Sequence, residues 1–373
     1  MITDRANSGR LAIIFAFVLM LALPLLQTMF HFASPLPVNE NRELAPAPRW
    51  SDVLHPADFT LALQRWFQDH YGFRDFLIRL QTQIDYSVFG VSDRIHIGKD
   101  GWLYYRNVID HEEPQIEAMP DRDLDATIAS FAHLRDWLAA KDIRFVVVTI
   151  QLKDRFYPEF LPLTAERALG RHRFDDFRTH LHAVPGIIYI DTTDTLLQLK
   201  QQRTIFHKTD FHWNDPAAFV ITGQLVDAIA AAEHRPVPLW HQTLEIEQRD
   251  FSGGEANFMP LFRQPHELAL FLRLAAPDPN LQTMAIREPF EQVTRMQGAA
   301  DNLLGPTVVL SDSFSDGMIR AGLPDYFQSI SRARIYHAPV DAVLRAIPEG
   351  TKTFILEFIE VSLPSFRDIP LPP

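Results

Sequence analysis

The spacing of hydrophobic and polar positions changes several times along the chain. Leu11 to Leu26 form an apolar run, which together with the apolar residues just beyond it is long enough for one membrane-crossing helix. From Phe59 to Val88 the apolar residues recur at helical spacing. The run IGKDGWLYY, from Ile97 to Tyr105, has a tight-turn signal between two β-prone segments and predicts a hairpin.

From residue 121 onward, helical and strand patterns alternate. Helices are expected over 121–140, 173–182 and 216–232, and short buried strands over 144–150, 186–191, 307–310 and 353–359. Runs of valine and isoleucine that alternate with helices predict a mostly parallel sheet covered on both faces. In such a sheet the active site forms at the carboxyl ends of the strands. Asp215 is the expected N-cap of the helix over 216–232.

These patterns divide the chain into four parts. Residues 1–10 are expected to be cytoplasmic, 11–33 a transmembrane signal-anchor, 34–120 a linker with an N-terminal subdomain, and 121–373 a catalytic α/β domain. Basic residues precede the apolar run, so the positive-inside rule keeps the N-terminus in the cytoplasm and exports the rest. A cleaved signal peptide is the alternative, but the segment is long for one and no A-x-A-like site follows it.

Composition limits the chemistry that remains open. The 373 residues include 35 Lys and Arg against 47 Asp and Glu, and the resulting charge of −12 argues against nucleic-acid binding. An acidic chain would also repel an anionic polymer unless a local basic groove compensates. Cysteine is absent from the sequence, which excludes disulfides, thiolate nucleophiles and Cys-ligated metals. The nucleophile of an enzyme would therefore be Ser, Thr, Asp, Glu or Lys.

The first candidate for chemistry is SDSFSDG, from Ser311 to Gly317. A buried strand is expected to end just before it and a short helix to follow. A serine on this turn would hold its hydroxyl at the strand tip and its N–H near a helix N-terminus, where the N–H can stabilise an oxyanion. The alternative is that serine and aspartate are simply helix caps here.

The second candidate is KTDFHWND, from Lys208 to Asp215. A serine nucleophile needs a base, which His212 supplies, and a carboxylate such as Asp210 to orient that base. Asp210 as a turn cap with His212 as a surface histidine is one alternative. A metal site of His207, Asp210 and His212 is another, which the lack of a clear fourth ligand weakens.

A third segment, QLKDRFYPE, follows the strand expected over 144–150. Gln151, Lys153 and Tyr157 would stand at the carboxyl edge of the sheet and line a pocket, or else be solvated loop residues. Among the tryptophans, Trp213 neighbours His212 and is the best placed to stack on a sugar.

These segments resemble the AlgJ/AlgX-type family of SGNH-hydrolase-like polysaccharide O-acetyltransferases. The matching pieces span essentially the whole exported part and are NENRELAPAP (39–48), YGFRDFLI (71–78), IGKDGWLYY, the Lys153–Glu159 portion, KTDFHWN and SDSFSD. The resemblance implies a three-layer SGNH-like fold and a triad of Asp210, His212 and Ser313. Its chain order is the reverse of ordinary SGNH hydrolases, which marks a permuted arrangement.

This sequence departs from the family pattern at one position, and the oxyanion donors of the pattern are not fully assigned in it. Ser311 replaces the glycine of a GDS-like element. The backbone N–H of Ser313 is the expected oxyanion donor, with Asn257 in SGGEANF as a further candidate. The family's larger members carry a carbohydrate-binding module after the catalytic domain; this chain ends shortly after its last strand and therefore looks more like the AlgJ type.

The resemblance implies an activity and its setting. The chain is expected to be a single-pass inner-membrane protein whose periplasmic domain transfers acetyl groups to an exopolysaccharide, alginate or similar, through an acetyl-serine. A membrane-bound O-acyltransferase would supply the acetyl group, and other polysaccharide secretion proteins would be partners. No cofactor or metal is expected. An acetylesterase with the same triad and a non-catalytic scaffold of an export complex are the alternatives.

Overall fold

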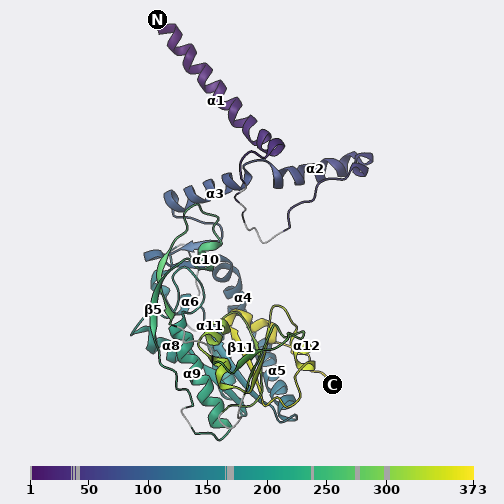
Figure 1. Cartoon of the computed structure of the whole chain (residues 1–373), viewed down its shortest axis with the longest axis vertical. Coiled ribbons are helices and arrows are strands. Elements are labelled where there is room, and N and C mark those ends of the chain that lie inside the picture. The colour runs from purple at the N-terminus through teal and green to yellow at the C-terminus, as the bar shows by residue number, and fades with distance from the viewer. Residues whose placement is uncertain are drawn as a thin grey trace. The chain divides into compact units, whose positions relative to one another are not determined.

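The structure is a computed structural model that describes residues 2–34, 36, 38, 43–163, 165, 172–236, 239–273, 278–297 and 303–373. The described chain forms two compact units (Figure 1). The first comprises residues up to Ser92 together with Asn257–Gln264, and the second comprises Asp93–Ala256 and Pro265–Pro373. Residues 35, 37 and 39–42 of the expected linker lie outside the described residues.

The first unit is helical. Its elements are α1 (Ile2–Phe30), the 3-10 turn η1 (Trp50–Leu54), α2 (Pro56–His70), α3 (Arg74–Ile84) and the π-helical turn η2 (Asp85–Phe89). The sequence pattern from 59 to 88 predicted one helical stretch, and the structure divides it in two. Phe73 adopts a left-handed φ of 63° at this break, which an α-helix does not permit.

Within the part of the chain that the structure describes, two helices are long and apolar enough to cross a membrane. One is the window Ile13–Phe30 of α1, which has a mean hydropathy of 2.3 and is unburied. The other, Asp215–Ala232, is 67% buried and is a core helix of the second unit. By length and composition, therefore, α1 is the candidate membrane span.

The second unit begins with the predicted hairpin. Strands β1 (Ile95–Ile97) and β2 (Leu103–Tyr105) pair antiparallel, with Ile97 opposite Leu103. Asp100 and Gly101 have φ values of 54° and 80° in the short turn η3 (Lys99–Gly101) between them. This left-handed geometry favours Asp-Gly, so the hairpin prediction is confirmed.

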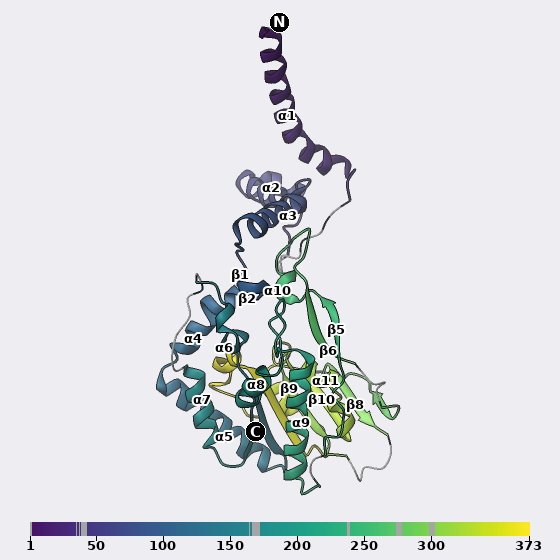
Figure 2. The same ribbon diagram turned by 90° about the vertical axis from the view of Figure 1, so that its left-hand side faces the viewer.

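A seven-stranded sheet forms the centre of this unit (Figure 2). Its order is β4 (Ile187–Asp191), β3 (Arg144–Ile150), β11 (Thr353–Ile359), β9 (Thr307–Ser311), β10 (Ser329–Arg334), β8 (Gln292–Met296) and β7 (Leu281–Thr283). The first five strands are parallel, and β8 runs antiparallel to both of its neighbours, β10 and β7. The four predicted strands are all present, whereas β10, β8 and β7 were not predicted.

Helices cover both faces of the sheet. Val146 and Val148 of β3 belong to a core with α9 (Asp215–Ala232). Phe145 and Val147 of the same strand belong to a second core with α5 (Asp121–Ala139), α7 (Arg173–His182) and α12 (Val340–Arg345). Because neighbouring residues of a strand point to opposite faces, the two cores lie on opposite sides, as predicted.

The remaining elements are η4 (Val108–Glu112), α4 (Glu113–Glu117), α6 (Lys153–Phe156), η5 (Pro158–Phe160), α8 (Thr193–Lys200), α10 (Gly254–Asn257), α11 (Ser315–Arg320), η7 (Leu323–Tyr326) and η8 (Glu360–Phe366).

Two local features differ from the sequence predictions. The N-cap of α9 is Asn214 and not Asp215, because the Asn214 side chain accepts a hydrogen bond from the N–H of Ala217 at 3.1 Å. A separate antiparallel pair, β5 (Ile246–Phe251) with β6 (Glu267–Leu272), was not predicted. Its first strand, IEQRDF, has three exposed residues in a row, so it lacks the apolar alternation that identifies a strand.

Candidate active site

The structure brings Asp210, His212 and Ser313 together at the carboxyl edge of the sheet. Ser313 lies in the turn between β9 and α11, and the other two lie in the loop before α9. His212 Nε2 is 2.7 Å from Ser313 Oγ, and His212 Nδ1 is 2.5 Å from Asp210 Oδ1. The three side chains form one hydrogen-bonded chain, in the geometry of a nucleophile, a base and a carboxylate that orients the base.

The environment of Asp210 favours its ionised form. Burial alone would raise the pKa of this carboxyl. Hydrogen bonds from the His212 ring, from the His212 N–H at 2.9 Å and from the Gly254 N–H at 2.6 Å outweigh the burial and lower the pKa. A carboxylate held charged in this way keeps the proton of the imidazole on Nδ1, so that Nε2 faces Ser313 as the acceptor.

Glycine is required where the backbone approaches Asp210. A Cβ on Gly253 would lie 2.4 Å from the Cβ of Asp210, closer than any real contact. The neighbouring Thr209 is fixed by Glu267 of β6, which accepts bonds from both its N–H and its hydroxyl at 2.8 Å. The unpredicted β5–β6 pair and the Gly-Gly turn after β5 therefore hold the loop that carries Asp210.

Lys153 also supports the loop that carries Asp210. Its ammonium donates to the carbonyl oxygen of Asp210 at 2.9 Å and to the buried carboxyl group of Glu255 in α10. Both side chains are almost fully buried, and burial raises the pKa of Glu255 to about 8. Lys153 was expected to line a pocket. In the structure its ammonium is hydrogen-bonded to groups inside the protein.

The turn that carries Ser313 is attached to the middle of the sheet by Asp312. One carboxylate oxygen accepts from the N–H of Phe314 at 2.8 Å, and the other accepts from the N–H of Ile359 at the end of β11, at 2.7 Å. Trp213 also fixes this turn, since its indole N–H donates to the carbonyl of Phe314 at 2.9 Å. Among the described residues, the N–H of Ser313 has no hydrogen-bond acceptor, so it is available to a ligand.

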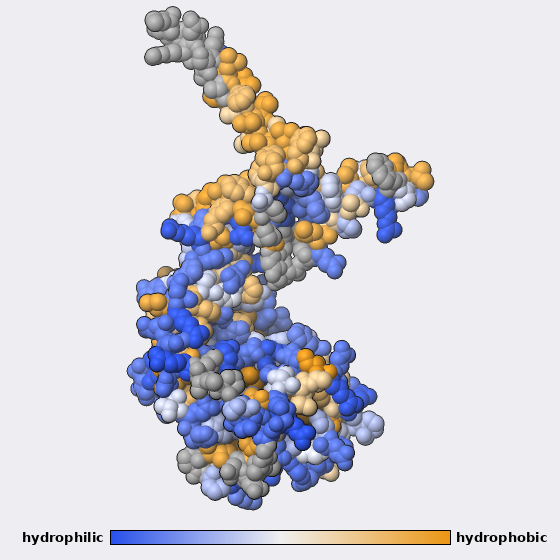
Figure 3. Space-filling view, in the orientation of Figure 1, coloured by the Kyte–Doolittle hydropathy of each residue, from blue (hydrophilic) through white to orange (hydrophobic). Residues whose placement is uncertain are grey.

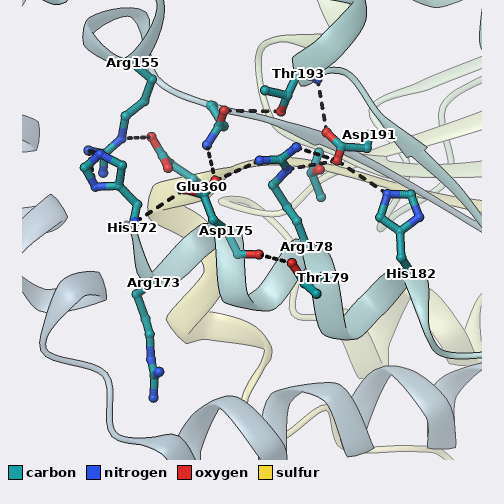
Figure 4. Close-up of polar contacts among 12 residues, drawn as sticks. Arg155, His172, Arg173, Asp175, Arg178, Thr179, His182, Asp191, Thr193 and Glu360 are labelled. Carbon is teal, nitrogen blue, oxygen red and sulfur yellow. Dashed lines mark hydrogen bonds and ion pairs between the residues drawn. The ribbon is translucent and has the colours of Figure 1, made fainter. Parts of the chain in front are cut away.

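A second polar network occupies the carboxyl ends of β3 and β4 (Figure 4). Arg178 donates two bonds to Asp191, at 2.7 and 2.9 Å, and a third to Asp175. Arg155 lies beside His172 and pairs with the buried Glu360 at 3.2 Å. Each arginine of this network is paired with carboxylates, so the network stabilises the edge of the sheet.

A cavity of about 380 Å³ opens beside the triad. Its lining includes all three triad residues together with Trp213, two arginines, Arg249 and Arg320, and two phenylalanines, Phe251 and Phe271. The two further carboxylates in the lining are paired with arginines, Asp215 with Arg320 and Asp316 with Arg334. The two arginines are paired as well, Arg249 with Glu247 and Arg320 with Asp215, so the lining is not a basic groove.

The other expected site residues have different positions. Tyr157 is buried, accepts from the N–H of Ile205 at 3.0 Å, and like Lys153 does not line the cavity. Gln151 is also buried and bonds to Asp175 of the second network. Asn257 is exposed and belongs to the first unit. Its role, like the substrate-binding roles expected for Lys153 and Tyr157, stays a prediction.

The metal alternative finds no support in the described ranges, where no three His, Asp or Glu residues are arranged to hold a metal ion. His207 instead packs between two aromatic rings, with ring centroids 4.8 Å from Phe251 and 5.3 Å from Phe271. Burial lowers the pKa of His207, which keeps it neutral in this apolar setting.

Several functional contacts were missed by sequence reasoning. Gly254 and Glu255 lie in the segment SGGE, whose paired glycines are the one local signal of a close backbone approach. Asp312 stands inside the SDSFSD segment, and nothing in the local pattern distinguishes its role from that of a cap. Glu267 gives no sequence signal, since its contact with Thr209 spans 58 residues.

Buried acids make a pH-dependent contribution to stability. Burial raises the pKa of Glu360 to about 7 and of Glu255 to about 8, and it also raises the pKa values of Asp312 and Glu357. The folded protein then binds more protons than the unfolded chain between the ordinary value of 4.5 for Glu and about pH 7. Its unfolding free energy is therefore expected to fall as the pH rises through this range, by up to about 1.4 kcal/mol per group and pH unit.

Urea unfolding of the full chain in detergent, at about pH 5.5 and about pH 7.5, checks this sign. Glu357→Gln, which mimics the protonated acid, should reduce the difference between the two conditions. A stability that rises toward the higher pH, in both proteins alike, would contradict the expectation.

Comparisons with known proteins place this fold in a class. The model of the SGNH hydrolase-like domain of acetyltransferase AlgX matches residues 95–307, more than half of the chain. Bacillus cereus PatB1 superposes with a TM-score of 0.51 at 13% identity, over 73% of this chain and 98% of that one. At this identity the likeness shows the fold alone. The second unit is thus an SGNH-like α/β domain with a central, mostly parallel sheet.

The chain belongs to this AlgX-type SGNH hydrolase-like family. Among curated proteins it is similar to the probable alginate O-acetylase AlgJ of Pseudomonas aeruginosa, with 27% identity over 246 residues, 64% of this chain and 60% of that protein. The corresponding AlgJ protein of Pseudomonas fluorescens is 29% identical over 247 residues, 63% and 57% of the two chains. The match therefore spans about 60% of the length of these relatives.

Proposed function

We propose that this protein is a polysaccharide O-acetyltransferase that uses Ser313 as the nucleophile. The observation that carries the proposal is the hydrogen-bonded chain from Asp210 through His212 to Ser313. Family membership and the AlgJ relatives support the same activity.

Two half-reactions follow from this geometry. In the first, Ser313 Oγ attacks the carbonyl carbon of an acetyl ester while His212 Nε2 takes the hydroxyl proton and passes it to the departing group. The N–H of Ser313 would donate to the oxyanion. In the second, a sugar hydroxyl gives its proton to His212 and its oxygen forms the new ester. The bond to Ser313 breaks, and Ser313 regains the proton.

The acceptor proposed from the relatives' names is alginate or a similar polymer. Alginate is anionic, and the net charge of −12 opposes its approach. Arg249 and Arg320 are the arginines of the cavity lining, and each already pairs with a carboxylate, Glu247 and Asp215. Arg249 is half exposed and lies over the ring of Phe271, 5.1 Å from its centroid, so it would bind a carboxylate of the polymer by exchanging its partner Glu247.

The proposed setting is the periplasmic face of the inner membrane, with α1 as the anchor. Its support is the unburied apolar window of α1. The acetyl group would come from a membrane-bound O-acyltransferase, since a catalytic domain outside the cytoplasm has no access to acetyl-CoA. Other polysaccharide secretion proteins are further partners in this proposal.

The test is an acetyl-transfer assay with the purified full chain in detergent. The protein is incubated with a nitrophenyl acetate donor and mannuronate oligosaccharides, and the products are weighed by mass spectrometry. We expect oligosaccharides that are heavier by acetyl groups, and a protein that carries one acetyl on Ser313 when no acceptor is present. Release of acetate alone, with the acceptor unmodified at saturating concentration, would identify an esterase and overturn the transferase assignment.

A further inference from the structure

The helices α2 and α3 have apolar residues at helical spacing, yet none of their residues is buried. On α2 the exposed apolar side chains include Leu63 and Phe67, one turn apart. On α3 they include Leu77, Leu80 and Ile84. Exposed fractions of these five range from 39% to 47%. An amphipathic helix ordinarily buries its apolar stripe, so these two helices lack a covering surface among the described residues.

The apolar surface continues past the end of α3. Val88 and Phe89 of η2 are 69% and 66% exposed, and Val91 follows them. Figure 3 shows apolar residues gathered over α1, α2 and α3, in contrast with the largely polar surface elsewhere in that view. A contiguous exposed surface of this kind marks a binding face.

The contacts between α1 and the corner that joins α2 to α3 identify what covers this face. The N–H of Gly72 donates to the Thr28 hydroxyl at 2.7 Å, and a Cβ on Gly72 would lie 2.3 Å from the carbonyl oxygen of Pro24. Phe73 packs against Phe32, with ring centroids 5.9 Å apart. The corner is thus seated on the last two turns of the candidate membrane span.

If α1 crosses the bilayer, this corner lies where the hydrocarbon core meets the head groups. Two short amphipathic helices fixed at that depth can lie in the interface plane with their apolar sides toward the acyl chains. We propose that α2 and α3 dock on the bilayer surface at the point where α1 leaves the bilayer. The protein is then attached to the membrane by one transmembrane helix and by a pair of interfacial helices. This inference rests on the membrane location proposed for α1.

Site-directed spin labelling of the full chain tests the inference, because the sequence contains no cysteine to remove. Leu63→Cys and Leu80→Cys probe the apolar stripes. Arg65→Cys is the matched control, since two residues of a helix turn by about 200° and place it on the other side of α2. Each variant is reconstituted in nanodiscs that contain anionic and zwitterionic phospholipids, and collisions with oxygen and with a water-soluble nickel chelate are measured.

We expect the ratio of oxygen to nickel collisions to be several-fold higher at positions 63 and 80 than at position 65. Leu19→Cys inside α1 and Arg122→Cys on α5 give the hydrocarbon and aqueous references. If positions 63 and 80 match Arg122→Cys while Leu19→Cys reports hydrocarbon, the interfacial docking is wrong although the span is present. If Leu19→Cys also reports water, the membrane location itself is wrong and the docking with it.

Discussion

Ser313→Ala is expected to lower acetyl transfer by about 10⁴-fold or more while leaving the fold intact. The hydroxyl of Ser313 is the one group in the cavity that His212 Nε2 contacts at 2.7 Å, so its loss removes the covalent route. Steady-state transfer from a nitrophenyl acetate donor, together with intact-protein mass spectrometry, measures the effect. The variant should no longer acquire an acetyl group.

Ser315→Ala is the matched control on the same turn. Ser315 is buried, and its hydroxyl donates to the carbonyl of Asp312 at 2.9 Å and contacts Ser311. Removing it costs about 1 kcal/mol of stability and leaves the nucleophile in place, so most of the activity should remain. Equal losses in the two variants would mean that the turn, and not the Ser313 hydroxyl, accounts for the effect.

Glu255→Ala is expected to lower the unfolding free energy by about 3 kcal/mol, because it leaves the buried ammonium of Lys153 without one of its hydrogen-bond acceptors. Lys153 donates to the carbonyl of Asp210, so the loss should also loosen the loop that carries Asp210 and reduce kcat. Denaturant unfolding and steady-state kinetics at neutral pH measure the two effects.

Glu255→Gln separates charge from packing at the same position. Because burial raises the pKa of Glu255 to about 8, the side chain is mostly protonated at neutral pH, and glutamine mimics that form. Glu255→Gln should therefore cost much less stability than Glu255→Ala. Equal costs for both variants would show that an ionised Glu255 is needed, contrary to the expected protonation state.

Local sequence patterns were sufficient for the elements that carry the triad. Strands β3 and β11 and helix α7 have the predicted bounds, because each is a short apolar or periodic run with clear ends. The two segments that hold Asp210, His212 and Ser313 could be found because each stands next to such an element. The rule that parallel strands present their sites at their carboxyl ends gave the general location, and the resemblance to the AlgJ/AlgX-type family implied that these three residues meet.

The supporting contacts could not be predicted because they are non-local. Lys153 meets Glu255 across 102 residues, and Asp312 meets the end of β11 across 47. Lys153 is an example. A lysine after a buried strand suggests a solvent-facing residue, and only the position of α10 shows that its ammonium is hydrogen-bonded inside the protein. Strand β5 was missed for a related reason, since its polar, exposed sequence has no core-facing period.

The place of β11 in the sheet has a consequence for how the chain acquires activity. This strand is the last in sequence, yet it lies between β3 and β9 and pairs with both. While the chain is being synthesised, the two halves of the sheet stay apart until β11 arrives, and Asp312 lacks the Ile359 N–H that it binds. Folding of this domain is therefore expected to finish late and slowly, as non-local pairing dictates. Ser313 and His212 are therefore expected to reach their final hydrogen-bonded arrangement only when the domain closes.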